Sequence, residues 1–324
     1  MSHTNLRQSL NWRRFDCLAG IISLAAIMIG ATVVMAATGP SRPTKARTRG
    51  AIQLTYLGNA GWRIEDGHSV VLVDPNLSQF RNKRGTDPNN DKDEIIAPDT
   101  AQIDSRVHRA DYILITHAHE DHLLDAPYIS NKTGAVIIGH ETAANIARAY
   151  DVPDEKLITV RRGEDYDFDG FSLKVIPSLH SPLLRKRYFN KPWAGSAPRG
   201  LKAPLHESAF VEGGSLAYLL RIAGHRVLIM GTMNFIEREM EGLRPDVALV
   251  GAGSSRKENF DYADRLLRAL GYPAVVFPTH WDSYGSMSEE EATRGVQEFV
   301  TEVKVASPKT RVIAPQYFQP ISLP

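Results

Sequence analysis

The stretch Asp111-Tyr-Ile-Leu-Ile-Thr-His-Ala-His-Glu-Asp-His122 decides how the rest of the chain is interpreted. A short apolar run leads into three histidines and an aspartate within six positions, namely His117, His119, Asp121 and His122. His117 and His119 alternate as in an extended turn, so both side chains can point the same way. Imidazole nitrogen and carboxylate oxygen are ligands that Zn²⁺ takes in catalytic sites. The stretch therefore predicts a metal site at the end of a buried strand.

Length and composition are those of an ordinary globular protein. The chain has 324 residues, of which 43% are hydrophobic and 23% are charged, and this suits one large domain or two small ones. The formal net charge of +1 gives no overall field that would favour nucleic acid as a partner. Cys17 is the single cysteine, so the body of the chain has neither a disulfide nor a thiolate to bind the metal.

The N-terminal segment has the features of a membrane anchor or a signal peptide. Arg7, Arg13 and Arg14 precede an apolar run over residues 17–38, and a helix needs roughly 20 apolar residues to cross a bilayer. Val34-Met35-Ala36 resembles a cleavage site, so both an anchor and a cleaved signal peptide are open, beside a buried core helix. The basic flank favours an exported body. Basic residues also follow the segment, which weakens that orientation: Arg42, Lys45, Arg47 and Arg49.

We therefore divide the chain into three parts. Residues 1–38 are the signal anchor or signal peptide, residues 39–50 are a linker, and residues 51–324 are the folded body. The protein is expected to be membrane-anchored or exported, at the inner membrane or in the periplasm of a bacterium.

The body alternates predicted strands with predicted helices. Strands are expected at 52–57, 62–64, 69–73, 110–116, 157–160, 171–177, 215–222, 226–230, 245–250, 274–277, 311–314 and 317–321. Helices are expected at 141–150, at 262–270 and from Ser288 to about Val303, where Ser288 and Glu291 form a capping box. The last two strands are expected to close the second of two sheets. Two sheet-rich halves with helices outside predict an α/β fold, a four-layer αββα sandwich.

Three other predicted strands end in a residue that can bind or support a metal. Asp74 follows Val71-Leu-Val, His180 follows Val175-Ile-Pro-Ser-Leu, and His280 follows Ala274-Val-Val-Phe-Pro-Thr. Strand ends meet at one edge of a layered α/β fold, so these side chains are expected near the histidine loop. His140, His206 and His225 have no identifiable partners and are taken as ordinary surface or turn histidines.

The signature His-x-His-x-Asp-His over residues 117–122 resembles that of the metallo-β-lactamase superfamily hydrolases, and the likeness extends over roughly Ile52 to Leu323. The opening stretch 54–62 is similar to the ascorbate-6-phosphate lactonase-like and N-acyl phosphatidylethanolamine phospholipase D-like branches. The resemblance implies two zinc sites, with Asp74 supporting the metal loop. Their ligands would be His117, His119 and His180 in one site and Asp121, His122 and His280 in the other.

One position departs from the family pattern. Where the family places a metal-bridging aspartate after a strand-end glycine, this chain has Thr232 after Gly231. A threonine hydroxyl stays protonated near neutral pH and bridges two cations poorly. Thr232 is therefore expected beside the metals without bridging them, with one or two zinc ions bound.

The resemblance implies a zinc-dependent hydrolase that uses a metal-bound hydroxide on an ester, lactone or phosphodiester, with Asp121 accepting a hydrogen bond from the nucleophile. The segment 181–214 is rich in basic and aromatic residues, which suits an anionic or lipid-like substrate. Expected partners are a small-molecule or lipid substrate and, if residues 17–38 are uncleaved, the membrane, but no nucleic acid. A non-catalytic metal-binding membrane scaffold and an iron-dependent oxidoreductase on the same ligands are the alternatives.

Overall fold

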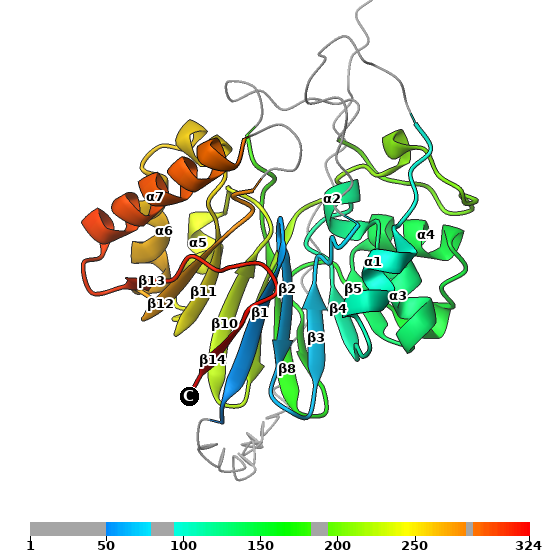
Figure 1. Cartoon of the computed structure of the whole chain (residues 1–324), viewed down its shortest axis with the longest axis horizontal. Helices are drawn as coiled ribbons and strands as arrows, with labels where there is room; N and C mark the ends of the chain where they lie inside the picture. The colour runs from blue at the N-terminus through cyan, green and yellow to red at the C-terminus, as the bar shows by residue number, and fades with distance from the viewer. Residues whose placement is uncertain (1–49, 79–93, 183–193, 283–287) are drawn as a thin grey trace, which may run out of the picture. The chain divides into compact units, whose positions relative to one another are not determined.

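A computed structural model of the chain describes residues 50–78, 94–182, 194–282 and 288–324 (Figure 1). The predicted membrane segment over residues 17–38 and nearly all of the predicted linker lie outside these residues. Within the described ranges, no helix combines the length and the apolar character that crossing a membrane requires.

The first sheet is mixed and has seven strands in the spatial order β14-β1-β2-β3-β4-β5-β6. From β14 to β3 neighbouring strands are antiparallel, and from β3 to β6 they are parallel. The strands of this sheet are β1 (Ile52–Gly58), β2 (Gly61–Glu65), β3 (Val70–Val73), β4 (Tyr112–Leu114), β5 (Val136–Gly139), β6 (Leu157–Thr159) and β14 (Pro320–Leu323).

The second sheet has seven strands in the order β13-β12-β11-β10-β9-β8-β7. From β13 to β10 neighbours are parallel, and from β10 to β7 they are antiparallel, so that β8, β10 and β12 run in the same direction. Its strands are β7 (Asp165–Asp167), β8 (Phe171–Pro177), β9 (Leu216–Ile222), β10 (His225–Met230), β11 (Val247–Gly251), β12 (Val275–Thr279) and β13 (Arg311–Val312).

Helices cover the outer face of each sheet, as Figure 1 shows. The first sheet carries α1 (Thr100–Arg106), α2 (Glu120–Leu123), α3 (Ala126–Thr133) and α4 (Glu141–Ala149), and the second carries α5 (Glu237–Met240), α6 (Tyr262–Leu270) and α7 (Glu289–Ala306). The capping box predicted for α7 is present. The predicted αββα layering is therefore confirmed in the described residues.

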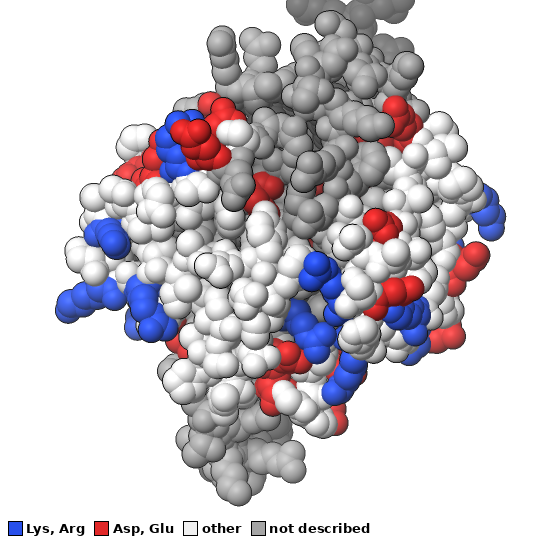
Figure 2. Space-filling model, in the orientation of Figure 1, with Lys and Arg blue, Asp and Glu red and all other residues white. Residues whose placement is uncertain are grey.

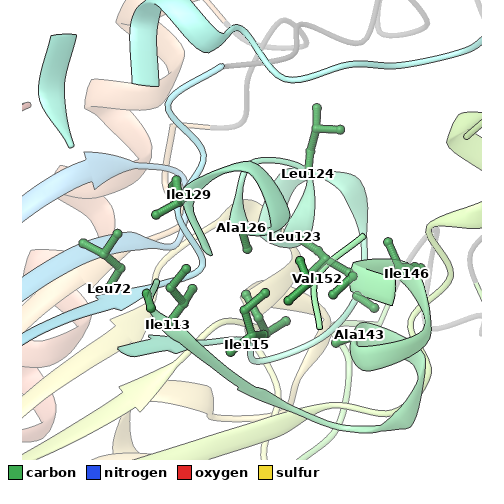
Figure 3. Close-up of a cluster of buried hydrophobic side chains, with 14 of the residues drawn as sticks. Leu72, Ile113, Ile115, Leu123, Leu124, Ala126, Ile129, Ala143, Ile146 and Val152 are labelled. Carbon is green, nitrogen blue, oxygen red and sulfur yellow. The ribbon is translucent and has the colours of Figure 1, made fainter. Parts of the chain in front are cut away.

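Three apolar layers hold these elements together. The layer between the sheets includes Trp62 and Phe277, whose rings meet edge to face. Beneath α3 and α4, Ile129 and Ile146 pack with Ile113 of β4 and with Ile115, which directly follows β4 (Figure 3). The third layer lies under α6 and α7. The histidine loop follows β4, which is packed on both faces, and this fixes the place where the loop begins.

One strand assignment was wrong. The segment 317–321 was expected to close the second sheet, but β14 pairs with β1 in the first, with Leu323 opposite Ile52. The neighbouring Phe318 amide also donates to the Tyr56 carbonyl, at 2.9 Å. The physical reason is that β1 is otherwise an edge strand with unpaired backbone groups, which β14 satisfies.

Charged side chains of both signs are mixed over the face drawn in Figure 2. Many are paired, as in the contacts of Lys132 with Asp104 and of Arg148 with Asp154, both 2.6 Å long.

Candidate metal centre

Both sheets direct the ends of their strands to one edge, and the predicted ligands lie there. In the first sheet, Asp74 follows β3 and the loop from Thr116 to His122 follows β4, which runs parallel to β3. In the second sheet, His180 follows β8 and His280 follows β12. Contacts between these histidines, described below, bring the two sets of strand ends together.

Asp74 organises the start of the histidine loop. Its carboxylate accepts the Thr116 amide at 2.7 Å, the Thr116 hydroxyl at 2.5 Å and a ring nitrogen of His122, Nδ1, at 2.8 Å. All three residues are fully buried. A β-carbon at Gly231 would collide with the Thr116 hydroxyl, so the end of β10 can approach this network only with glycine. Asp74 therefore orients His122 through the ring nitrogen that faces away from the other histidines.

His117, His119 and His180 form the first group of candidate ligands. One ligand atom from each lies within 4.8 Å of the others. Their ring centroids are 4.7 to 4.9 Å apart, and the rings meet edge to face. Burial, together with neighbouring histidines, lowers the pKa of His117 well below its ordinary value and that of His180 to about 3. Both imidazoles are thus neutral at neutral pH, which is the form that binds a metal.

Asp121, His122 and His280 form the second group. The Asp121 Oδ2 atom lies 3.4 Å from Nε2 of His122 and 3.4 Å from Nε2 of His280. Two ligands bound at about 2.0–2.1 Å to a tetrahedral metal are separated by about 3.4 Å, so each of these two pairs has the spacing of metal ligands. The residues around Asp121 whose ligand atoms all lie within 4.8 Å of one another are Asp121, His122 and His117, whereas His280 reaches this cluster through Asp121.

In the second group, the carboxylates and the imidazoles shift one another's pKa values. Burial alone would lower the pKa of His122, but Asp121 and Asp74 raise it to about 10. Burial would raise the pKa of Asp121, but His122 and His280 hold it well below its usual range. The Nε2 atom of His122 is buried and makes no hydrogen bond of good geometry in the described part of the chain. A divalent cation at this atom would replace the proton, so the donor set fits a metal.

Sequence reasoning missed Asn59, which links the two sheets at this site. Its side-chain amide donates to the main-chain oxygen and to Oδ2 of Asp121, at 2.9 Å each. Its backbone carbonyl accepts the backbone amide of His280 at 2.6 Å. Asn59 and His280 both have left-handed backbone conformations, with φ of 52° and 50°. The available signal was the turn Gly58-Asn59-Ala60-Gly61, where asparagine tolerates such a conformation.

Asp282 fixes the segment that follows His280. Its carboxylate accepts the backbone amide of Asn59 at 3.1 Å and the Tyr56 hydroxyl at 2.5 Å, and also the Tyr317 hydroxyl. Asp282 is thus used in holding the loops together.

Thr232 does not belong to either group of candidate ligands. Its hydroxyl donates to the Leu179 carbonyl at 2.8 Å, next to His180. Within the described residues, neither group contains a carboxylate from the end of β10.

Two of the three histidines taken as surface or turn residues are buried. His225 is 2% exposed and contacts the Asp246 carboxylate through Nδ1 at 3.0 Å and the Gly50 carbonyl through Nε2 at 3.1 Å. His140 is 8% exposed and contacts the Gly214 carbonyl. The error has a physical reason: the three partners lie 21, 175 and 74 positions away in the sequence, so the local pattern does not reveal them.

Comparisons with known proteins show the family and the fold of the chain. The domain family described as "Beta-lactamase superfamily domain" matches residues 53–280. A UPF0173 metal-dependent hydrolase from Christiangramia forsetii is 32% identical over 130 residues, 40% of this chain and 49% of that protein, so this match spans about half of its length. A UPF0173 metal-dependent hydrolase from Paracoccus denitrificans is 23% identical over 276 residues, covering 84% of this chain and 100% of that protein.

Among solved structures, the fold is similar to that of Igni18, a metallo hydrolase from the archaeon Ignicoccus hospitalis. The TM-score is 0.58 at 20% sequence identity, over 85% of this chain and 99% of the other. At this identity the likeness shows a shared fold.

Proposed function

The chain belongs to the metallo-β-lactamase superfamily, and on that premise we propose that it is a metal-dependent hydrolase that uses zinc to cleave an ester, a lactone or a phosphodiester. The observation that carries the proposal is the position of Asp121, whose Oδ2 lies 3.4 Å from both His122 and His280. The proposed ligands are His117, His119, Asp121, His122, His180 and His280.

Zinc held by these residues would supply Lewis acidity, which lowers the pKa of water to about 7 and polarises a carbonyl or phosphoryl oxygen. The chain contributes the orientation of the groups around the reacting atoms. Asp121 is held by Asn59 through two hydrogen bonds, and in the proposed reaction it would accept a hydrogen bond from the attacking water. Asp74 fixes the ring of His122 from behind, as a carboxylate commonly does for a metal-binding histidine.

We further propose that the two groups bind metal with unequal affinity. A carboxylate bridge neutralises part of the charge of two cations, and Thr232 offers a hydroxyl that is already donated to Leu179. The group of His117, His119 and His180 would then fill first, and the group with Asp121 would bind more weakly.

Metal analysis of the purified protein, combined with assays on ester, lactone and phosphodiester panels, tests the proposal. Zinc with turnover of one panel is the expected result. His119→Ala should lose both metal and activity, whereas His68→Ala, which changes an exposed histidine beside Asp169, should keep both.

Tight metal binding without turnover of any panel would favour the non-catalytic scaffold. Two iron atoms per chain would favour the oxidoreductase. Wild-type activity in His119→Ala would contradict the assignment altogether.

The sequence also motivates a proposal about location. The apolar run over residues 17–38 follows three arginines, and we propose that it anchors the protein in a membrane or exports it. Fractionation of cells that express the full chain, with N-terminal sequencing of the product, separates an anchor from a cleaved signal peptide. Recovery of the uncleaved chain in the soluble fraction would contradict both.

A further inference from the structure

A cavity of about 320 Å³ lies beside the first group of candidate ligands. His180 forms part of its wall, together with apolar side chains that include Leu179 and Ile236. Its volume is at the lower end of the range for ligand pockets, about 300–1,000 Å³, so it suits a small molecule with a short apolar part.

Arg162 brings a positive charge to this cavity. The residue is exposed, and its guanidinium forms no salt bridge within the part of the chain that the structure describes. Some other arginines of the protein are paired, such as Arg221 with Asp165 at 2.7 Å and Arg256 with Glu302 at 2.8 Å. Glu212 also lines the cavity and brings a negative charge to it, and its carboxylate accepts the Ser215 hydroxyl at 2.8 Å.

The backbone around Arg162 is fixed so that the guanidinium lies against the cavity wall. The Glu164 carboxylate accepts the backbone amides of Arg161 and Arg162, at 2.6 and 2.7 Å. A β-carbon on Gly214 would lie 2.5 Å from the Nη2 atom of Arg162, so the guanidinium packs directly on the glycine backbone. Gly214 has a φ of +110°, a conformation that glycine adopts readily.

We propose that Arg162 binds an anionic group, a carboxylate or a phosphate, of a small substrate whose scissile bond lies at the histidines next to the cavity. A guanidinium presents paired donors that match the oxygens of both anions. The inference rests on the proposed hydrolase function and adds to it the class of substrate, a small anion with a short apolar segment.

The test compares Arg162→Met with Arg161→Met in the metal-loaded full chain. Both changes remove one positive charge from adjacent exposed positions, but Arg161 is absent from the described wall of the cavity. The binding probes are inorganic phosphate and butyrate, measured by calorimetry. The substrates are mono-p-nitrophenyl succinate and p-nitrophenyl butyrate, which share a leaving group and differ in a terminal carboxylate.

Arg162→Met should weaken binding of phosphate, of butyrate or of both by about tenfold or more relative to Arg161→Met, as expected for a lost charge-assisted hydrogen bond. The anion affected more strongly identifies the recognised group. For a carboxylate, the ratio of kcat/KM for the succinate ester to that for the butyrate ester should fall similarly, with partial rescue by Arg162→Lys. Equal binding of both anions by the two methionine variants would overturn the proposal. The wild type could cleave neither ester while Arg162→Met alone weakens anion binding. That result would support the anion site and contradict the proposed hydrolysis of esters.

Discussion

Asn59 donates its side-chain amide to the main-chain oxygen and to Oδ2 of Asp121, at 2.9 Å each. The backbone carbonyl of the same residue accepts the backbone amide of His280, at 2.6 Å. Asn59 therefore fixes two members of the second ligand group relative to each other, although it offers no ligand of its own.

Asn59→Gly should lower the affinity for the more weakly bound metal by about 10- to 100-fold, the usual effect of losing a residue that orients a ligand. Glycine is the suitable replacement because it accepts the φ of 52° without strain, so that only the amide is lost. Zinc competition with a chromophoric chelator measures the change.

Asn131→Ala is the matched control for Asn59→Gly. Its side-chain amide also donates to a backbone carbonyl, that of Tyr150, at 2.9 Å, but from the outer helix α3. Equal zinc affinities in Asn59→Gly and Asn131→Ala would show that Asn59 does not position Asp121.

Asp74→Asn should weaken both folding and metal binding. The buried carboxylate accepts three hydrogen bonds, and an amide of the same shape turns one accepting oxygen into a donor that faces other donors. We expect the free energy of unfolding to fall by about 2–5 kcal/mol, with a clear loss of zinc affinity because His122 is no longer oriented.

Thr116→Val separates the two roles of Asp74. It removes the hydroxyl contact with Asp74 at 2.5 Å and a contact with His117 at 3.3 Å, and it spares the contact of Asp74 with His122. Stability should therefore fall by about 1 kcal/mol, and zinc affinity should fall far less than in Asp74→Asn. Denaturant unfolding and zinc titration of both variants provide the comparison. If Thr116→Val loses as much zinc affinity as Asp74→Asn, the contact between Asp74 and His122 is not what prepares the site.

The sequence predicted those parts of the site whose signal is local. The histidine loop after β4 is contiguous, and His180 and His280 end runs of apolar residues that form strands, so periodicity and residue type suffice to find them. Asn59 was missed because its partner Asp121 is 62 positions away. A Gly-Asn turn has the same sequence whichever part of the fold it contacts, so its partners cannot be predicted from it.

The errors in the fold have the same physical cause. A strand pattern such as that of β14 predicts an extended segment but does not identify the strand beside it. That strand is β1, which lies far from β14 in the sequence. The pairing of His225 with Asp246 likewise follows from two adjacent parallel strands, β10 and β11. Contacts of this kind depend on tertiary packing and leave no trace in local periodicity.

Thr232→Val should affect the first ligand group and leave the second unchanged. The hydroxyl donates to the Leu179 carbonyl beside His180, so its removal should cost about 1 kcal/mol of stability and loosen the segment that carries this histidine. A two-step zinc titration should show weaker binding in the first step and the same number of metals. Loss of the second step alone would mean that Thr232 contributes to the group with Asp121.

His140 should titrate far below the usual range, and Arg162 should be part of the cause. Burial, followed by the charge of Arg162, lowers the pKa of His140 from 6.5 to about 4. The unfolded chain therefore takes up this proton first as the pH falls from 6.5 to 4, and the contribution to stability, about 3 kcal/mol in full, is lost across that window.

Arg162→Met should raise the pKa of His140 and flatten the fall in stability, whereas Arg161→Met should change neither. Chemical shifts of the His140 ring, followed by NMR during a pH titration, measure the pKa in each variant. An identical pKa in both variants would place the Arg162 guanidinium away from Gly214 and His140, and so away from the cavity wall where anion binding is proposed.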